Sequence, residues 1–269
     1  MRIIFVRHGE PDYTKDSLTE KGWHEAQLLA DRISQWNVTQ FYCSPLGRAK
    51  DTASCTLKKL NREAITLDYM QEFSYRVTDP LTGKFGNPWD YVPSDWTSIP
   101  EMMDMNAWAF TERMKENPKL STEYQRVWTE FDKLLASYGY VREHNYYRCP
   151  NKPERFRIKT PNPEELIQKE FKEGTHPNSF PDDTDEPTIV IFCHLGIICL
   201  VLSHLLNIPF QLLTHGFFLP TTSLTVLTSE ERWSNEAYFR VQAMGDVTHL
   251  LKNNEPISSA GAFADAFQG

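Results

Sequence analysis

The stretch MRIIFVRHG, residues 1–9, places a cation, an imidazole and a glycine directly after a short apolar run. Such a run predicts a buried strand, because strands covered on both faces read as continuous apolar residues. The stretch TIVIFCHLG, residues 188–196, repeats the pattern of an apolar run followed by a histidine and a glycine. In open α/β sheets, ligands bind outside the carboxyl ends of the strands. The two stretches therefore predict two imidazoles, His8 and His194, at one edge of a sheet.

The segments around these stretches alternate between helix and strand patterns. Helices are predicted over 16–36, 44–60 and 196–207, and strands over 39–43, 64–68, 188–193, 223–230 and 237–244. The helix over 44–60 is expected to begin at Ser44, with Pro45 at its first helical position. This alternation predicts an α/β fold, a mainly parallel sheet with helices on both faces, in one domain over residues 1–269.

The alternation is interrupted over residues 73–186, which are rich in aromatic residues, proline and asparagine. Helical spacing predicts an amphipathic helix over 121–140 and a shorter, more exposed helix over 162–174. We expect 73–186 to be a large, mostly helical and irregular insertion that forms a cap over the strand ends, where it would set substrate choice. Its aromatic side chains are expected to form a core of their own. The alternative is that Trp89 or Tyr91 lines a pocket for the leaving group.

Composition and charge disfavour several classes of protein. The net charge of −8 and the isoelectric point of about 5.5 argue against nucleic acid as a partner. The apolar run over 188–206 is divided by His194 and Gly196, so it predicts a strand and a helix and no membrane span. Five scattered cysteines and the absence of a metal-ligand motif predict a cytoplasmic protein without disulfides, metal or cofactor. The tail over 253–269 is weakly patterned, and we expect it to be loosely held.

Arg48 follows the second predicted strand, in the segment CSPLGR. We expect it to reach the same sheet edge as Arg7, His8 and His194. Four cationic or donor groups in one small space repel one another unless an anion lies between them. Phosphate is the natural anion, because a guanidinium group binds it through two parallel hydrogen bonds. The group therefore predicts a small phosphorylated substrate.

Five segments together resemble the histidine phosphatase superfamily, in its phosphoglycerate mutase-like branch (branch 1). They are RHGE at 7–10, SLTEKGWHEAQLLADRI at 17–33, YCSPLGRAKDTA at 42–53, CHLGII at 193–198 and GDVTHL at 245–250. The resemblance implies a phosphoglycerate mutase-like fold, in which His8 attacks the phosphoryl group and becomes a phosphohistidine. It also implies that Arg7, Arg48 and His194 hold the phosphate oxygens. This scheme needs no metal.

The resemblance further implies an acidic residue that protonates the leaving oxygen. In the family this acid often follows the third strand, and Glu72 occupies that place here. Glu10, Asp12 and Asp79 are nearby alternatives. The chemistry suits a carboxyl in this position, because a dianionic phosphate raises the pKa of a neighbouring carboxyl and lets it hold a proton to donate.

The chain departs from the family pattern at two phosphate-binding positions. Thr14 stands where most relatives carry asparagine, and its hydroxyl is expected to donate in place of the amide. Leu195 replaces a common glycine, and its backbone N–H can still donate to phosphate. The HD pair of the acid phosphatases and the ERHYG stretch of cofactor-dependent mutases are absent. These absences favour a phosphomonoester hydrolase, a histidine phosphatase, over a mutase.

Four alternative functions compete with this one. A phosphoglycerate-type phosphomutase and a non-catalytic phospho-ligand sensor on the same fold stay open. A cysteine-based phosphatase is disfavoured, because four residues separate Cys43 from Arg48 where the loop of that class has five. A nucleotide-binding module is disfavoured, because the first predicted strand is followed by neither a GxGxxG motif nor a Walker loop.

Overall fold

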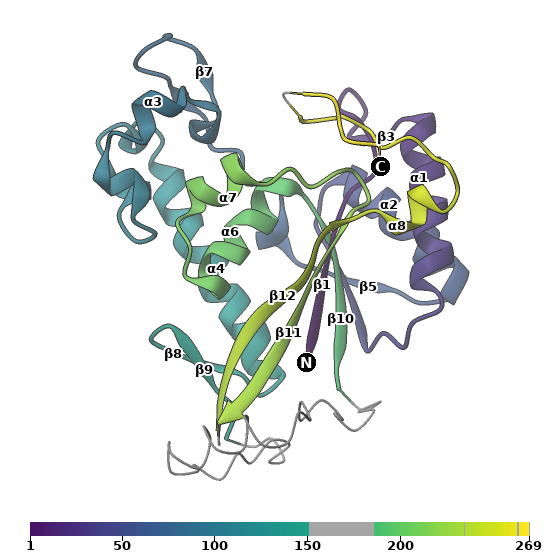
Figure 1. Cartoon of the computed structure of the whole chain (residues 1–269). Coiled ribbons are helices and arrows are strands. Elements are labelled where there is room, and N and C mark those ends of the chain that lie inside the picture. Colours follow the sequence, from purple (N-terminus) through teal and green to yellow (C-terminus); the bar gives the residue numbers. More distant parts are fainter. Residues whose placement is uncertain (151–185, 234, 263, 269) are drawn as a thin grey trace, which may run out of the picture.

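The computed structural model describes residues 1–150, 186–233, 235–262 and 264–268, and within them an eight-stranded sheet forms the centre (Figure 1). Its order is β5-β4-β10-β1-β11-β12-β9-β8. Its strands are β1 (Arg2–Arg7), β4 (Gln40–Cys43), β5 (Ala64–Thr66), β8 (Val141–Glu143), β9 (Tyr146–Arg148), β10 (Thr188–Cys193), β11 (Leu224–Trp233) and β12 (Glu236–Asp246).

The described helices and minor strands complete the element order. The α-helices are α1 (Glu20–Ile33), α2 (Gly47–Leu60), α3 (Pro93–Trp96), α4 (Pro118–Ser137), α6 (Leu195–Leu206), α7 (Phe210–Gly216) and α8 (Thr248–Leu251). The 3-10 helices are η1 (Asp68–Met70), η2 (Pro88–Asp90), η3 (Pro100–Met103), η4 (Trp108–Phe110) and η5 (Met114–Glu116). Two small antiparallel pairs are formed by β2 (Pro11–Asp12) with β3 (Ser17–Leu18) and by β6 (Val77–Thr78) with β7 (Phe85–Gly86).

The strands β5, β4, β10 and β1 are parallel neighbours. The two strands predicted from the opening pattern, β1 and β10, lie side by side, and Arg7 pairs with Cys193 at their ends. Both strands therefore end at the same edge of the sheet, where His8 follows β1 and His194 follows β10. The predicted meeting of these two strand ends is confirmed.

The other half of the sheet is antiparallel. Strand β11 pairs with β1 on its free side, and β12, β9 and β8 follow in turn. The predicted α/β fold is confirmed, with the parallel order confined to the half that carries the histidines. The antiparallel strands extend the sheet beyond β1, on the side opposite β10.

Helices cover both faces of the sheet, as predicted (Figure 1). The alternating side chains of β1 divide the core into two layers, because successive residues of a strand point to opposite faces. Ile4 and Val6 pack with α1 and α2. Ile3 and Phe5 pack with the layer that holds α4, α6 and α7.

Helix α1 begins at Glu20, inside the helix predicted over 16–36. The side chain of Thr19 caps it by accepting a hydrogen bond from the N–H of Gly22 at 3.0 Å. Helix α2 begins later than predicted, at Gly47, and its N-cap residue Leu46 makes no side-chain cap. The expected start at Ser44 was wrong for a physical reason. The Ser44 hydroxyl bonds the His194 ring at 2.7 Å, so this serine joins two strand ends and caps no helix.

The described part of the insertion does not form a separate core, contrary to expectation. Helix α4 packs on the sheet itself, where the rings of Phe131 and Phe5 lie 5.9 Å apart. Trp108 stacks on Phe210 of α7 with ring centroids 4.9 Å apart, so the aromatic residues are continuous with the main core. The side chain of Trp89 lies outside the described residues, as does the predicted helix over 162–174.

The tail is better fixed than its weak pattern suggested. Ile257 and Ser258 are buried, and Ser258 donates a hydrogen bond to Glu10. The expectation of a loosely held tail was therefore wrong for this part of it. Among the described residues, no helix combines the length and the apolar character needed to cross a membrane.

The packing of α4 on the sheet can be tested by Phe131→Ala. Phe131 is fully buried, so its truncation should lower the free energy of unfolding by about 3–5 kcal/mol. The matched change Phe85→Ala, at a phenylalanine that is 59% exposed in β7, should cost less than about 1 kcal/mol. Urea unfolding measures both. Equal, small losses would mean that α4 is dispensable to the core.

Candidate functional site

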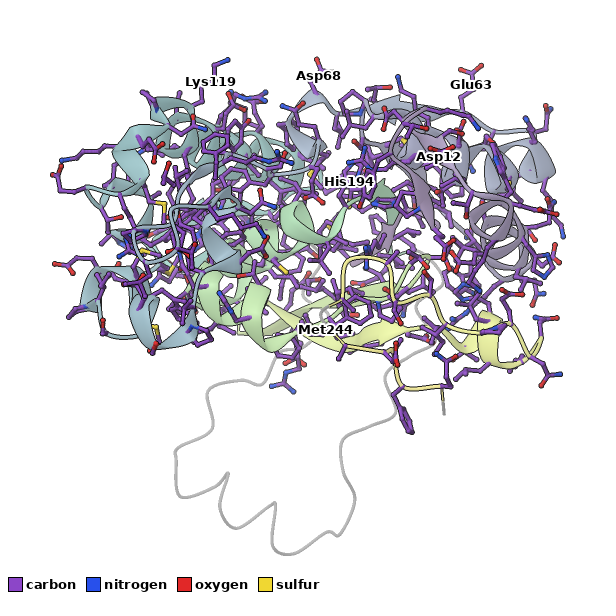
Figure 2. The ribbon with its side chains drawn as sticks, turned by 90° about the horizontal axis from the view of Figure 1, so that it is seen from above. Asp12, Glu63, Asp68, Lys119, His194 and Met244 are labelled. Carbon is purple, nitrogen blue, oxygen red and sulfur yellow. The ribbon has the colours of Figure 1, made fainter. Side chains whose placement is uncertain are left out.

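Two buried imidazoles face each other at the carboxyl edge of the parallel strands. The rings of His8 and His194 have centroids 5.1 Å apart. The backbone N–H of His8 donates to the carbonyl of Cys193 at 3.0 Å, which extends the β1–β10 pairing by one residue. Seen from above, His194 lies near the middle of the molecule, with Lys119 of α4 to one side and Asp12 to the other (Figure 2).

The hydrogen bond of the His8 ring fixes its tautomer. Nδ1 lies 2.7 Å from the carbonyl oxygen of Gly9. A carbonyl oxygen can only accept, so Nδ1 carries the proton and Nε2 keeps its lone pair. Burial is the main cause that lowers the pKa of His8 to about 3, and the charge of Arg7 adds to it. The ring is therefore neutral at pH 7, with a nucleophilic nitrogen available.

Gly9 attaches the loop after His8 to α2 and lets it approach α1 closely. Its N–H donates to the hydroxyl of Thr52 at 2.9 Å, and that hydroxyl donates to the carbonyl of Arg48 at 2.7 Å. A Cβ at Gly9 would lie 2.7 Å from the carbonyl oxygen of Gly22. The glycine after His8 is thus required by the close approach of helix α1.

Arg7 is buried and bound through both terminal nitrogens. Nη1 donates to the carbonyl of Leu219 at 2.6 Å, and Nη2 donates to the carbonyl of Ala260 at 2.7 Å. Its guanidinium carbon also lies 5.6 Å from the centre of the Phe218 ring. The Nε atom is buried and has no hydrogen-bond partner within the described part of the chain. Arg7 is therefore held in one orientation with a donor left over.

Arg48 is held by a carboxylate that the sequence did not single out. Its Nη1 donates to Asp16 at 2.6 Å, and the other oxygen of Asp16 accepts from the N–H of Gly47 at 2.6 Å. The guanidinium carbon of Arg48 lies 5.5 Å from the centre of the Tyr13 ring. As with Arg7, Nε of Arg48 is buried without a partner among the described residues. Asp16 adopts a left-handed backbone conformation with φ 49°, and no pattern in the sequence marked it for this role.

His194 stands at the N-terminus of helix α6, as its strand-to-helix position predicted. Its Nε2 bonds Ser44 at 2.7 Å, and its Nδ1 is buried without a partner in the described chain. Burial lowers the pKa of His194 well below its usual value, helped by the neighbouring His8 and the two arginines. The N–H of Leu195 lies in the first turn of α6, where no helical carbonyl is available to it.

Glu72 also reaches the N-terminus of α6. Its Oε1 accepts from the N–H of Ile197 at 3.2 Å and from the N–H of Phe73 at 2.9 Å. A Cβ at Gly196 would lie 2.6 Å from the same oxygen, so this glycine makes room for the carboxyl. Burial raises the pKa of Glu72, against the opposing charges of Arg48 and Arg7. Among the four acidic candidates, Glu72 combines electrostatic contact with both arginines and a raised pKa.

The other candidates are engaged elsewhere. Glu10 accepts from the hydroxyls of Thr19 and Ser258, and the backbone N–H of Leu81 and its neighbour lower the pKa of Asp79 in the β6–β7 turn. Hydrogen bonds from Thr14 are the main cause that lowers the pKa of Asp12 to about 2. Thr14 itself is exposed, and its hydroxyl donates to Asp12 at 2.5 Å. Its expected phosphate contact therefore competes with this internal bond.

The arrangement suits an anion with several acceptor oxygens. Three buried nitrogens, Nε of Arg7, Nε of Arg48 and Nδ1 of His194, lack partners among the described residues, and Nδ1 of His194 is a donor when the Ser44 hydroxyl donates to Nε2. Burying such donors unpaired is unfavourable, and a phosphate would satisfy them. The part of the chain that the structure describes contains no cluster of His, Cys, Asp and Glu arranged to hold a metal ion. Burial raises the pKa of Cys43 to about 12, so this thiol is not a ready nucleophile.

Comparisons with known proteins identify the family of the chain. The family model of the histidine phosphatase superfamily (branch 1) matches residues 3–136. A 2,3-bisphosphoglycerate-dependent phosphoglycerate mutase from Thermoplasma acidophilum is 33% identical over 152 residues, which are 52% of this chain and 76% of the relative.

Solved structures share the fold at lower identity. A phosphoserine phosphatase variant from Entamoeba histolytica, in complex with phosphoserine, is 16% identical with a TM-score of 0.50, over 93% of this chain and 98% of the other. A mycobacterial glucosyl-3-phosphoglycerate phosphatase with inorganic phosphate is 18% identical with a TM-score of 0.51, over 92% and 98%.

The neutral state of His8 makes a prediction about stability. Because its pKa in the folded protein lies below the value of about 6.5 expected in the unfolded chain, the unfolded chain binds a proton that the folded protein does not. The free energy of unfolding should therefore decrease as the pH drops below about 6.5. Between pH 7 and 5, wild type should lose about 2 kcal/mol more than His8→Gln.

Urea unfolding in buffer without phosphate measures this difference. His144→Asn, at an exposed histidine in the β8–β9 turn, controls for the loss of a histidine as such. Parallel pH profiles for wild type and His8→Gln would mean that His8 titrates alike in the folded and unfolded chains.

Proposed function

Because this chain belongs to the histidine phosphatase superfamily (branch 1), we propose that it hydrolyses phosphomonoesters through a covalent phosphohistidine at His8. One observation carries the proposal. The buried ring of His8 is neutral and keeps the lone pair of Nε2, 5.1 Å from a second imidazole and in electrostatic contact with two arginines. A nucleophile beside donors for three phosphate oxygens is the arrangement that phosphoryl transfer needs.

In the first step, the lone pair of Nε2 of His8 forms a bond to phosphorus. The bond between phosphorus and the ester oxygen breaks, and that oxygen takes the carboxyl proton of Glu72. The raised pKa of Glu72 supports this role, because a general acid must hold its proton at the working pH. The alcohol then leaves, and the enzyme carries a phosphoryl group on His8.

In the second step, water attacks the phosphorus of the phosphohistidine. Its proton goes to the Glu72 carboxylate, and the electrons of the P–N bond return to Nε2 of His8. Inorganic phosphate leaves, and both residues regain their starting states. The lone pair and the proton are thus used once in each direction.

The surrounding donors would stabilise the charge on the transferring group. Among the described residues, Nε of Arg7 and Nε of Arg48 are donors without partners, and Nδ1 of His194 is a third when Ser44 donates to Nε2. The first turn of α6 adds the N–H of Leu195. Two guanidinium groups supply the positive charge, so the scheme runs without a metal ion or a cofactor. Thr14 contributes only where its hydroxyl exchanges Asp12 for phosphate.

The substrate is proposed to be a small phosphorylated metabolite. The solved relatives that share the fold hold phosphoserine or inorganic phosphate. The net charge of −8 disfavours nucleic acid as a partner, and the reducing chemistry expected for free cysteines fits the cytoplasm. The cap role of residues 73–186, which would select the leaving group, belongs to the same proposal.

A phosphoglycerate-type phosphomutase is the second candidate. It is favoured by the name of the Thermoplasma acidophilum relative, which is a phosphoglycerate mutase. Both reactions form the same phosphohistidine, and they differ in the group that accepts the phosphoryl. Water accepts it in a phosphatase, whereas a hydroxyl of the substrate accepts it in a mutase.

Trapping the intermediate tests the nucleophile. Rapid quenching with a ³²P-labelled phosphomonoester in excess chelator should leave label on the protein as an acid-labile, alkali-stable adduct, because phosphohistidine has that stability. His8→Ala should abolish both the adduct and turnover. Label that survives this change, or that maps to Cys43, would contradict the mechanism.

The acceptor is read from the same reactions. For a phosphatase, release of inorganic phosphate should match the loss of substrate. Isomerisation of a phosphoglycerate with little free phosphate would establish the mutase instead. Tight phosphate binding without either reaction would establish the phospho-ligand sensor.

The role of Glu72 is tested by the leaving group. An alkoxide leaves poorly and needs a proton, whereas nitrophenolate leaves well without one. Glu72→Gln should therefore lose roughly 10²–10⁴-fold in kcat on an alkyl phosphate and much less on nitrophenyl phosphate. Glutamine keeps the shape and can still accept from the N–H of Ile197. Equal losses on both esters would make Glu72 structural and move the acid role to Glu10, Asp12 or Asp79.

A further inference from the structure

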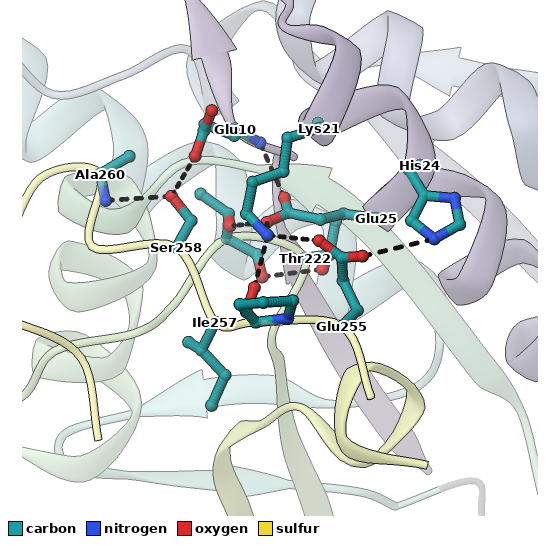
Figure 3. A network of polar contacts seen from close by, with 12 residues as sticks. Glu10, Lys21, His24, Glu25, Thr222, Glu255, Ile257, Ser258 and Ala260 are labelled. Carbon is teal, nitrogen blue, oxygen red and sulfur yellow. Dashed lines mark hydrogen bonds and ion pairs between the residues drawn. The ribbon is translucent and has the colours of Figure 1, made fainter. Parts of the chain in front are cut away.

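The C-terminal segment over residues 255–261, here called the clasp, is held to Lys21 and to Glu10 by a network of polar contacts (Figure 3). Lys21 of α1 bonds both the carboxylate of Glu255 and the carbonyl of Pro256. Ser258 donates to the carboxylate of Glu10 at 2.6 Å. Glu10 is two residues after His8, so the clasp is tied directly to the loop that carries the nucleophile.

A buried carboxylate anchors the loop on which the clasp rests. Glu25 is fully buried, and it accepts from the N–H of Glu10 and from the hydroxyl of Thr221, each at 2.9 Å. The next residue, Thr222, donates its N–H to the carbonyl of His8 at 3.2 Å. Lys21 lies 3.8 Å from Glu25, so one lysine links this anchor to the clasp.

The clasp continues to Arg7. The carbonyl of Ala260 accepts from Nη2 of Arg7 at 2.7 Å, while the carbonyl of Leu219 holds Nη1 at 2.6 Å. Two carbonyls, one on each terminal nitrogen, fix both the position and the plane of the guanidinium group. Its Nε is left as a buried donor without a partner among the described residues.

Gly261 shows how closely the clasp approaches this group. Its φ of +80° lies in the region that disfavours residues with a side chain, and a Cβ there would lie 2.9 Å from Nη2 of Arg7. The nearest atom is thus the guanidinium group itself. A side chain at this position would displace either Arg7 or the clasp.

We propose that the clasp is a positioning segment for Arg7, in which Ala260 and Gly261 aim the guanidinium group so that its free Nε meets the phosphate. The proposal rests on the proposed function only in taking phosphate as the ligand of this site. The clasp touches Arg7 and contributes no group to the reacting atoms. Opening the clasp therefore weakens phosphate binding, because Arg7 loses its fixed orientation.

Gly261→Ala tests the proposal, with Gly83→Ala as its matched control. Gly83 has a similar φ of +67°, and a Cβ there meets nothing within 4 Å, so the control imposes the backbone strain without touching Arg7. Titration calorimetry with inorganic phosphate measures Kd for each, and thermal unfolding measures stability. Gly261→Ala should raise Kd roughly ten- to a hundredfold, as for loss of a charge-assisted hydrogen bond, whereas Gly83→Ala should leave Kd unchanged.

A double-mutant cycle separates positioning from general loosening. In an Arg7→Ala background, Gly261→Ala should raise the Kd for phosphate no further, because the group it displaces is gone. Ser258→Ala should weaken phosphate binding in the same direction, and Ser258→Thr, which keeps the hydroxyl, should restore it. Equal Kd values for Gly261→Ala and Gly83→Ala, or additive effects in the cycle, would overturn the proposal.

Each of these results is a binding measurement, so it stands apart from turnover. Phosphate affinity that depends on the clasp in a protein without hydrolytic activity would support the positioning role and refute the proposed reaction. Turnover through phosphohistidine, with a Kd for phosphate that does not depend on the clasp, would support the proposed reaction and refute the positioning role.

Discussion

Burial of four basic side chains around one point is the constraint on which this structure depends. Arg7, His8, Arg48 and His194 lie at the carboxyl edge of two parallel strands, where charges cannot be screened by water as at a surface. The protein meets the constraint in two ways. It keeps both imidazoles neutral, and it surrounds the guanidinium groups with main-chain carbonyls and Asp16. The donors that remain are those an anion would satisfy.

The residues at the ends of the two parallel strands could be predicted from the sequence, because short local patterns mark them. An apolar strand that ends in a histidine and a glycine is readable within nine residues, and parallel strands bring such ends to one edge. The positions of His8, His194 and Arg7 follow from that rule. Glu72 has no such signal, and only its place after the third strand in a family resemblance identified it. The residue nevertheless lies against the N-terminus of α6.

The rest depends on contacts between distant segments that no local pattern encodes. Ser44 resembles a helix cap, but its hydroxyl is taken by a histidine 150 residues away. Asp16 reads as the first residue of a predicted helix, and the tail reads as a weakly patterned segment, until the fold brings them to Arg48 and Arg7. The aromatic residues of the insertion indicated a separate core because their partners on the sheet and on α7 lie elsewhere in the chain.

The bond between Arg7 and Ala260 spans 253 residues of chain. During synthesis, the first strand leaves the ribosome with its arginine and histidine long before either β10 or the clasp exists. Contacts of such sequence separation form slowly, because the loop they close loses much conformational entropy. The basic edge therefore stays incomplete on the nascent chain until residues 255–261 have been synthesised. A chain truncated before residue 255 would therefore carry His8 and Arg7 without the carbonyl of Ala260 that holds the guanidinium group.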